Sequence, residues 1–413
     1  MRRQIEGSHA MAETVARCRP QVVPAYPITP QTHIVEGIGA MVKAGTLAPC
    51  EYITVESEFG AMSAAIGASA AGARTYTATA SQGLLYMAEA LFNASGMGLP
   101  IVMTVANRAI GAPINIWNDH SDSMSQRDCG WVQLYAEDNQ SAVGLHVLAF
   151  RLAEQLSVPV MVCVDGFVLT HAFEPIEVPE QSVVDAFLPP YEPRQVLDPD
   201  DPVTIGAMVG PEAFTEVRYL AHHQLQQAIE CLPILTGEYE AVTGQSLSSV
   251  SAYRTDGAST VVVALGSVTG TIKDAVDEIA ESVGVVTLTL YRPFPVDEVR
   301  AALADAEHVI VLERAFAPGA GGVVSADVRA ALSGLPTRVS TVVAGLGGRA
   351  VTKASVQAML AEAAADRLPE LSFLDLRTDI VEQELARRES VHRAGPHSQA
   401  VLRSAGVPGS RIG

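Results

Sequence analysis

The feature of this sequence that most constrains its fold is a regular alternation of short β-branched runs with helical patterns. In the first half of the chain the runs predict strands at Gln21–Ala25, Tyr52–Val55, Thr75–Ala80, Ile101–Val105 and Val158–Val164. The helical patterns between them begin at Pro30, Glu56, Gly83 and Gln140. Parallel strands need helical crossovers and are covered on both faces. The alternation therefore predicts an α/β fold with a parallel sheet.

The alternation starts again in the second half of the chain. Expected strands there are Thr260–Leu265, Val285–Leu290, His308–Leu312 and Arg338–Val343. Helices are expected at Glu212–Leu232 and Asp379–Glu389. Because 413 residues exceed one ordinary core, we expect more than one domain. The expected division is a first domain over residues 1–235 with a proline-rich surface excursion at 176–203, a second α/β domain over 236–365, and a C-terminal helical arm over 366–413.

Charge and composition exclude several classes of function. The net charge of −19 would repel a nucleic-acid backbone or an anionic membrane. The longest uncharged stretch of the first half, residues 90–107, contains polar residues, glycines and a proline, so no membrane span is expected. The five cysteines form no CxxC pair, which favours reduced thiols in a cytoplasmic protein and argues against an iron–sulfur cluster held by this chain alone.

The first residues carry no expected targeting signal. Residues 1–6 lack the apolar core of a secretory signal. The segment Gly7–Met11 reads Gly-Ser-His-Ala-Met, which is typical of a cloning remnant. Because one helical pattern continues on both sides of it, we treat it as native sequence.

A proline-stiffened bend follows the first expected strand. Pro27 and Pro30 bracket Ile28 and Thr29, and proline fixes its own φ while pushing the preceding residue toward extended geometry. Ligands of α/β proteins bind at the carboxyl ends of such strands. A plain strand-to-helix connection, with proline at the first helical position, explains the same residues.

Three polar residues stand at or just beyond the carboxyl ends of expected strands, so they are expected to converge on one sheet edge. They are Thr29, Glu58 and Arg108. Glu58 lies in a nearly uncharged region beside a helix start, where it either serves chemistry or caps the helix. Arg108 is suited to bidentate binding of a carboxylate, and the alternative is a structural ion pair with Glu58 or Asp119.

Several motifs give the chain a family resemblance. They are Tyr-Pro-Ile-Thr-Pro-Gln-Thr at 26–32, Ser-Glu-Phe-Gly at 57–60, Thr-Ala-Ser-Gln-Gly-Leu at 79–84, Asn-Asp-His-Ser-Asp at 118–122, Tyr-Arg-Pro-Phe-Pro at 291–295, Glu-Arg-Ala at 313–315 and Gly-Leu-Gly-Gly-Arg at 345–349. In order and spacing, from about residue 4 to about residue 405, the chain resembles the α subunit of the 2-oxoacid:ferredoxin oxidoreductases, the family of the pyruvate enzyme.

The resemblance implies a fold and a set of roles. It implies a thiamine diphosphate pyrimidine-binding domain followed by a domain like the carboxyl-terminal domain of transketolase. Glu58 would hydrogen-bond the aminopyrimidine ring of thiamine diphosphate and favour the tautomer that deprotonates the thiazolium carbon. Thr29 and Arg108 would contact the 2-oxoacid, with Arg108 on its carboxylate. Ser81 and Gln82 lie in the matching loop and would shape the cofactor site.

A missing motif implies partner subunits. Thiamine diphosphate needs Mg²⁺, usually signalled by Gly-Asp-Gly, and this sequence has none. The resemblance therefore implies a β subunit that supplies the Mg²⁺-diphosphate site and an iron–sulfur cluster, with γ and ferredoxin-like δ subunits completing the set. The implied reaction is oxidative decarboxylation of a 2-oxoacid to an acyl-CoA and CO2, with CoA as co-substrate and ferredoxin or a related acceptor taking the electrons.

Two other functions compete with this one. The first is a non-redox thiamine diphosphate enzyme of the transketolase or decarboxylase kind, and the second is a non-catalytic assembly subunit. The substrate is left open among pyruvate, branched-chain and aryl 2-oxoacids such as an arylglyoxylate, and oxalate, because all share the carboxylate and carbonyl that the motif would bind.

Three smaller features have ordinary explanations. Asp119, His120 and Asp122 suggest a metal site, but a polar loop at a subunit contact is the favoured explanation. The turn at 345–348 suggests phosphate binding, but a helix start is favoured. His222 and His223 are adjacent on an expected helix and are expected to be surface residues.

Overall fold

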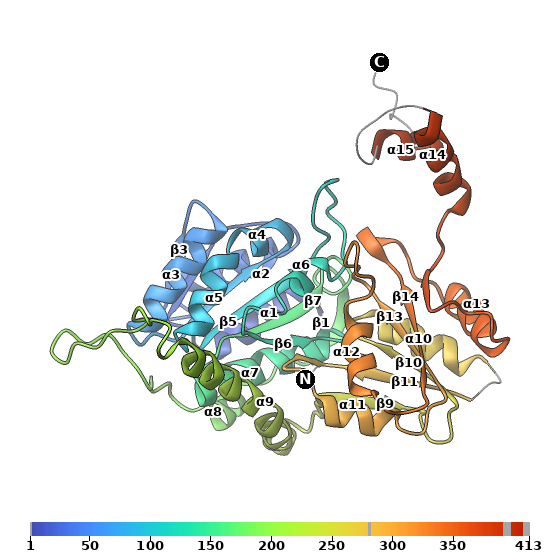
Figure 1. Ribbon diagram of the computed structural model, residues 1–413. Helices are drawn as coiled ribbons and strands as arrows, with labels where there is room; N and C mark the ends of the chain where they lie inside the picture. The colour runs from blue at the N-terminus through green and yellow to red at the C-terminus, as the bar shows by residue number, and fades with distance from the viewer. Residues whose placement is uncertain (1, 280–281, 391–397, 408–413) are drawn as a thin grey trace.

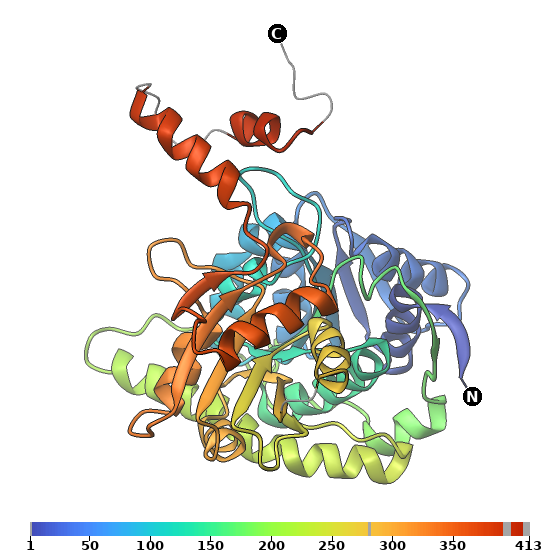
Figure 2. The ribbon, with the colours of Figure 1, turned by 90° about the vertical axis from the view of Figure 1, so that its right-hand side faces the viewer.

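The computed structural model describes residues 2–279, 282–390 and 398–407 (Figure 1). Their helices and strands form two sheets with covering helices, a small two-stranded sheet near the N-terminus, and C-terminal helices that project from the body in Figures 1 and 2. In this part of the chain, no helix combines the length and apolarity that a membrane span requires.

The first sheet has seven strands in the order β12-β6-β7-β5-β4-β2-β3. Their bounds are β2 (Val22–Ala25), β3 (Glu51–Thr54), β4 (Thr75–Thr79), β5 (Ile101–Asn107), β6 (Val132–Tyr135), β7 (Val160–Asp165) and β12 (Leu290–Arg292). All pairs are parallel except β12 with β6. The five strands expected in this region are therefore present, in the expected parallel sheet, and β6 is an addition to them.

Helices cover both faces of this sheet. Successive residues of a strand point to opposite faces, so a strand that is apolar throughout needs cover on both. Val102 of β5 belongs to the core that contains α1 (Gly7–Arg17), α2 (Thr32–Lys43), α7 (Asn139–Leu156) and α9 (Phe214–Thr243). Its neighbours Ile101 and Met103 belong to the core on the other face, with α3 (Glu58–Ala70), α4 (Ser81–Tyr86) and α5 (Ala88–Gly96).

The second sheet has six strands in the order β15-β14-β13-β10-β11-β9. Their bounds are β9 (Val250–Tyr253), β10 (Thr260–Ala264), β11 (Val283–Leu288), β13 (His308–Glu313), β14 (Arg338–Val343) and β15 (Leu371–Phe373). Helices α10 (Val268–Asp277) and α13 (Lys353–Ala364) pack on one face, whereas α11 (Val296–Leu303) and α12 (Val324–Ala331) lie on the face that shares its core with the first sheet.

The two sheets are joined by more than the linking chain. Apolar residues of both, such as Met161 of β7 and Val286 of β11, belong to one continuous buried cluster. The expected strand Val285–Leu290 is split: β11 ends at Leu288, and β12 then crosses over to pair with β6. The edge of the first sheet is therefore completed by residues that follow a strand of the second.

The N-terminal segment is part of the fold. β1 (Arg3–Glu6) pairs antiparallel with β8 (Phe173–Ile176), so the helical pattern expected before Gly7 is wrong and α1 begins only at Gly7. A Cβ on Gly7 would lie 2.1 Å from the carbonyl oxygen of Leu169. The buried Ser8 hydroxyl donates to the carbonyl of Thr170 at 2.7 Å. The residues that resemble a cloning remnant are thus closely packed in the structure.

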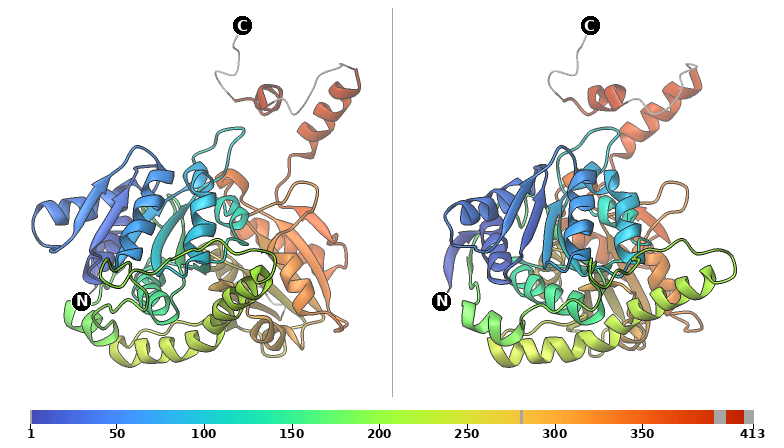
Figure 3. Two further views of the ribbon diagram at one scale, coloured as in Figure 1. Left: turned by 60° about the vertical axis from the view of Figure 1, so that its left-hand side comes forward. Right: turned by 90° about the vertical axis from the view of Figure 1, so that its left-hand side faces the viewer.

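Three segments differ from their expected form. The excursion at 176–203 contains a short helix, α8 (Gln181–Phe187), before the chain runs without helix or strand. Helix α9 continues through Pro233 to Thr243, packs against α7 and lies at the bottom of both views in Figure 3. Within the expected C-terminal arm, β15 belongs to the second sheet, and the projecting helices are α14 (Thr378–Ser390) and α15 (Ser398–Ser404) (Figure 2).

Candidate functional site

The residues proposed for the site each follow a different strand of the first sheet. Thr29 follows β2, Glu58 follows β3, Ser81 follows β4 and Arg108 follows β5. These four strands are neighbours in the order β5-β4-β2-β3 and run parallel, so their carboxyl ends lie along one edge. The structure therefore places the four residues together at the carboxyl ends of the strands.

Glu58 is the first residue of α3, but it does not cap that helix. The cap is Ser57, whose hydroxyl accepts the Gly60 N–H at 3.1 Å. The Glu58 side chain is nearly buried and lies against Gly83, where an added Cβ would stand 2.7 Å from Oε1. Within the described residues its carboxylate makes no hydrogen bond or ion pair. A buried carboxylate in this state is suited to accept a bond from a ligand.

The Thr79 hydroxyl lies beside this carboxylate. The position of an added Cβ on Gly83 is 2.6 Å from Thr79 Oγ1, and this buried oxygen has no hydrogen-bond partner among the described residues. Two polar groups without partners thus flank a glycine at one point of the sheet edge. Because Gly83 has no side chain, the Glu58 carboxylate can occupy the space beside it.

Arg108 and Thr29 are brought together directly. The Arg108 guanidinium donates from Nη1 to the carbonyl of Thr29 at 3.0 Å and from Nε to the carbonyl of Asn115 at 3.0 Å. It forms no ion pair with Glu58 or Asp119. Burial lowers the pKa of Arg108, against the opposing charge of Asp122, but a guanidinium stays protonated. Its remaining N–H groups are available to an anionic ligand.

Ser81 and Gln82 shape the loops between these residues. Ser81 has left-handed backbone geometry with φ of 51°, and its hydroxyl donates to the carbonyl of Ala109 at 2.6 Å. The Gln82 amide lies against Gly111, where an added Cβ would be 2.7 Å from Nε2. Both residues thus contact the loop that follows β5.

Asp122 is the residue whose importance the sequence did not reveal. It is fully buried in α6 (Ser121–Ser125) and accepts hydrogen bonds from the backbone N–H of Ser81 at 2.9 Å and of Arg108 at 3.0 Å. Asn107 Nδ2 donates to its other oxygen at 2.8 Å. Burial raises the pKa of Asp122 to about 6, against the effect of these donors. The residue was predicted only as part of a polar loop, because its partners are remote in sequence.

The acidic loop around Asp122 connects the two sheets of this chain through side-chain contacts. His120 Nε2 lies 2.8 Å from Asp165 Oδ1, and Asp119 accepts the Gly347 N–H at 2.9 Å. The side chains of Asp119, His120 and Asp122 are all buried within the chain and bond to different partners, so they form no common metal site. The expectation that this loop lies at a subunit contact stays a prediction.

A second carboxylate fastens the loop to the second sheet. Asp165 ends β7 and contacts Arg314 at 3.1 Å and the Ser267 N–H at 2.8 Å, both of which follow strands of the second sheet. Burial alone would raise the pKa of Asp165, but the charges of Arg314 and His120 hold it well below its usual range. The rule that finds Thr29, polar residues at strand ends, would also have found Asp165.

The glycine-rich turn at 345–348 takes part in the same contact between the two sheets. It forms a short 3-10 turn, η1 (Leu346–Gly348), and α13 begins only at Lys353, so the expected helix start at the turn is wrong. Asn115 Nδ2 donates to the Gly347 carbonyl at 3.1 Å. Gly347 has φ of 59°, in the left-handed region that glycine tolerates. The turn therefore holds the loop that carries Asn115, one of the partners of Arg108.

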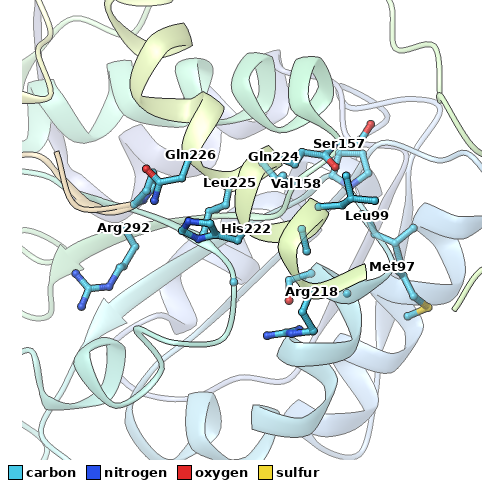
Figure 4. Close-up of a pocket in the computed structure, with 18 of the residues that line it drawn as sticks. Met97, Leu99, Ser157, Val158, Arg218, His222, Gln224, Leu225, Gln226 and Arg292 are labelled. Atoms are coloured by element: carbon cyan, nitrogen blue, oxygen red, sulfur yellow. The ribbon is translucent and has the colours of Figure 1, made fainter. Parts of the chain in front are cut away.

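A cavity of about 690 Å³ lies away from this site (Figure 4). It is lined by residues that precede β5 and β7, among them Leu99 and Val158, and by Arg218 and His222 of α9. These are the amino ends of the strands. None of the five predicted site residues lines this cavity, which is therefore distinct from the candidate site.

Comparisons with known proteins agree with the arrangement of the two sheets. Residues 13–232 match the family described as pyruvate flavodoxin/ferredoxin oxidoreductase, thiamine diP-bdg, and residues 258–356 match pyruvate:ferredoxin oxidoreductase core domain II. Pyruvate synthase subunit PorA of Methanosarcina barkeri is 44% identical over 91% of this chain and 97% of its own length. Ketoisovalerate oxidoreductase subunit VorA of Pyrococcus abyssi is 39% identical over 87% of this chain and 92% of its own.

Solved structures share the fold. A 2-oxoglutarate:ferredoxin oxidoreductase from Magnetococcus marinus matches 89% of this chain and 65% of its own chain with a TM-score of 0.66 and 19% identity. A split gene transketolase matches 88% of this chain and 99% of its own with a TM-score of 0.51 and 13% identity. The predicted fold class, a thiamine-diphosphate fold followed by a transketolase-like α/β domain, is confirmed.

We predict that Asp122→Asn changes the pH dependence of stability. The pKa of the carboxyl group is near its ordinary value of 3.8 in the unfolded chain and about 6 in the folded one. Between these two values the folded state holds a proton that the unfolded state has lost. As pH rises from 4 to 7, wild type should therefore lose about 2 kcal/mol of stability relative to Asp122→Asn, most of it below pH 6, with no further relative change above pH 7.

Urea denaturation of both proteins across pH 4–8 measures this difference. Asp128→Asn, which removes an exposed carboxylate, is the matched control. A constant difference between wild type and Asp122→Asn across the whole range would contradict the prediction.

Proposed function

The chain belongs to the pyruvate flavodoxin/ferredoxin oxidoreductase family and is an α subunit of a 2-oxoacid:ferredoxin oxidoreductase, and from this membership we propose its reaction and the roles of its site residues. The resemblance found in its motifs is thereby confirmed. The proposed reaction is the thiamine diphosphate-dependent and CoA-dependent oxidative decarboxylation of a 2-oxoacid to an acyl-CoA and CO2. The supporting observation is the nearly buried Glu58 carboxylate, which has no partner among the described residues and shares a sheet edge with Arg108 and Thr29.

Glu58 is proposed to bind the aminopyrimidine ring of thiamine diphosphate. When bound, this cofactor supplies the carbon nucleophile and the electron sink that the reaction needs. The nearly buried carboxylate fits a ring nitrogen as partner, because sharing a proton with that nitrogen satisfies it without an ion pair. Gly83 keeps the contact open, since any side chain there would meet the carboxylate. Ser81 and Gln82 are proposed to shape this part of the site.

Arg108 and Thr29 are proposed to bind the 2-oxoacid. The guanidinium donates two of its N–H groups to backbone carbonyls and keeps the others for the substrate carboxylate. The Thr29 hydroxyl is positioned by the same contact, because Arg108 holds the Thr29 carbonyl, and it is proposed to donate to the oxygen of the former carbonyl. Decarboxylation removes the charge that Arg108 binds, so the arginine serves substrate binding more than the loss of CO2.

Partner subunits are proposed to complete the site. A β subunit would supply the Mg²⁺-diphosphate site and an iron–sulfur cluster, γ and δ subunits would complete the complex, and ferredoxin or a related acceptor would take the electrons. The domain division at residues 235 and 365 is proposed on the same basis, with the projecting helices α14 and α15 as an arm that docks on a partner. The five free cysteines support a cytoplasmic location.

The competing functions have less support. A non-redox thiamine diphosphate enzyme would share the fold, but the relatives that match most of this chain carry the names of 2-oxoacid oxidoreductase subunits. A decayed assembly subunit would have no need to keep Glu58, Thr29 and Arg108 together at one sheet edge.

We predict pyruvate as the preferred substrate, because six matched relatives named pyruvate synthase subunits are 40–45% identical whereas two ketoisovalerate subunits are 38–39% identical. The test is CoA-dependent dye reduction by the native complex with pyruvate, 2-oxoisovalerate, 2-oxoglutarate, an arylglyoxylate and oxalate. The largest kcat/KM is expected for pyruvate. A larger value for any other acid would refute this assignment and leave the reaction class standing.

We predict that Glu58→Gln leaves the complex assembled but lowers pyruvate-dependent dye reduction at least 100-fold. The amide cannot share its proton with the ring nitrogen as a carboxyl group does, so general acid–base help is lost. Glu56→Gln, two residues away on an exposed side chain, is the matched control and should keep wild-type activity. Full activity of Glu58→Gln in an assembled complex would overturn the proposed role.

We predict that Arg108→Ala raises KM for the 2-oxoacid at least tenfold with a smaller change in kcat. The expectation follows because the guanidinium binds the carboxylate in the ground state and in the transition state alike. Arg108→Lys keeps a positive charge but lacks the planar guanidinium group, so its KM should lie between those of wild type and Arg108→Ala. An unchanged KM in both variants would show that Arg108 only holds the loops together.

A further inference from the structure

Three residues from distant parts of the chain meet beside the N-terminal strand. Glu6 ends β1, His33 lies in the first turn of α2, and His171 lies in the segment between β7 and β8. One potential metal-ligand atom from each lies within 4.8 Å of the others. Among the described residues these three are the group of His, Cys, Asp and Glu side chains that satisfies this condition. We call them the Glu6–His33–His171 cluster.

The contacts within the cluster are close. Glu6 Oε1 lies 2.6 Å from His33 Nδ1, and the rings of His33 and His171 have centroids 4.8 Å apart. The Glu6 side chain is only 9% exposed. A nearly buried carboxylate thus faces two imidazoles, so the cluster is not an isolated surface ion pair.

The second nitrogen of His171 is already engaged. Its Nδ1 lies 2.7 Å from the Thr170 hydroxyl, and that hydroxyl in turn accepts the Phe167 N–H at 2.8 Å. This arrangement orients the ring and leaves Nε2 for another partner. Metal-binding histidines are commonly oriented in this way through the nitrogen that does not bind the metal.

We propose that the Glu6–His33–His171 cluster binds a divalent transition metal of the zinc type. Two imidazoles and one carboxylate are a known ligand set for Zn²⁺, with the fourth position taken by water or another ligand. Zinc–nitrogen distances of about 2.0–2.1 Å place tetrahedral ligands about 3.3 Å apart. Side-chain rotations that lengthen the 2.6 Å Glu6–His33 contact and draw the other ligand atoms, which lie within 4.8 Å of one another, closer together would provide this spacing. His9, whose Nδ1 lies 3.6 Å from Glu6 Oε2, is a candidate for the fourth position.

The proposed site goes beyond the proposed function, and its location gives it a structural role. His33 follows the bend that carries Thr29, and the segment leading to His171 packs on that bend: an added Cβ on Gly166 would lie 2.5 Å from Pro30 Cγ. A metal at the cluster fastens β1, α2 and this segment together. It thereby stabilises the bend without contacting the reacting atoms.

The test is metal binding by the full chain after treatment with EDTA. Calorimetric titration with ZnCl2 should show one Zn²⁺ bound per chain. Thermal unfolding in the presence of ZnCl2 should show a raised midpoint. CoCl2 should give the visible absorption of four-coordinate Co²⁺. His33→Ala and His171→Ala should each weaken Zn²⁺ binding at least tenfold. The double variant of the α9 residues His222 and His223 to alanine is the matched control and should bind as wild type does.

Two results would overturn the proposal. One is the absence of saturable Zn²⁺ binding by the folded wild-type chain, which would leave a hydrogen-bonded cluster. The other is Zn²⁺ binding that persists in both histidine variants, which would place the metal elsewhere, for example on cysteines. If the alanine variants do not fold, Glu6→Gln removes the anionic ligand with less change in shape and must weaken binding in the same assay.

Discussion

The geometry of the candidate site depends on one buried carboxylate. Asp122 accepts backbone N–H groups from Ser81, after β4, and from Arg108, after β5, so a single side chain joins two loops that the sheet alone would leave independent. Its partners among the described residues are all donors, and only an acceptor satisfies them. An aliphatic residue there would leave those donors buried and unsatisfied, at about 1–3 kcal/mol each. Ser81 keeps its left-handed backbone because this bond and the Ala109 contact fix it.

The same loop makes the site depend on the second sheet. Asp119 binds the glycine-rich turn, and His120 binds Asp165, which in turn contacts Arg314 between the two sheets. Because Asp165 is fully buried, its charge is stable only while Arg314 and the neighbouring donors are docked. Separation of the two sheets would expose apolar surface and leave these charges without partners. The second sheet therefore supports the loops of the first sheet that carry the candidate site residues.

The sequence predicts the sheet well because β-branched runs report burial on both faces. It misses β1, β6, β8, β9, β12 and β15, which have only three or four residues each and whose strand character comes from pairing with distant segments. Glu58 was detectable as a charge in an uncharged region at a strand end. Asp122 was not, because nothing local distinguishes a buried acceptor from a solvated loop residue. The roles of Thr29, Glu58 and Arg108 stay predictions, whereas their convergence on one sheet edge is observed.

The electrostatics of Arg108 are compatible with its proposed role of binding an anionic substrate in a chain of net charge −19. A buried guanidinium without an ion pair carries a desolvation cost, and here carbonyl oxygens offset only part of it. An acidic partner would offset more, but it would then have to be displaced by the substrate. Because the cation has neutral partners, the substrate carboxylate of the proposed function would itself complete its hydrogen bonding. In the proposed role, the affinity for the 2-oxoacid would come from this local charge, which the low dielectric of the site strengthens, whereas solvent and salt screen the acidic groups of the surface.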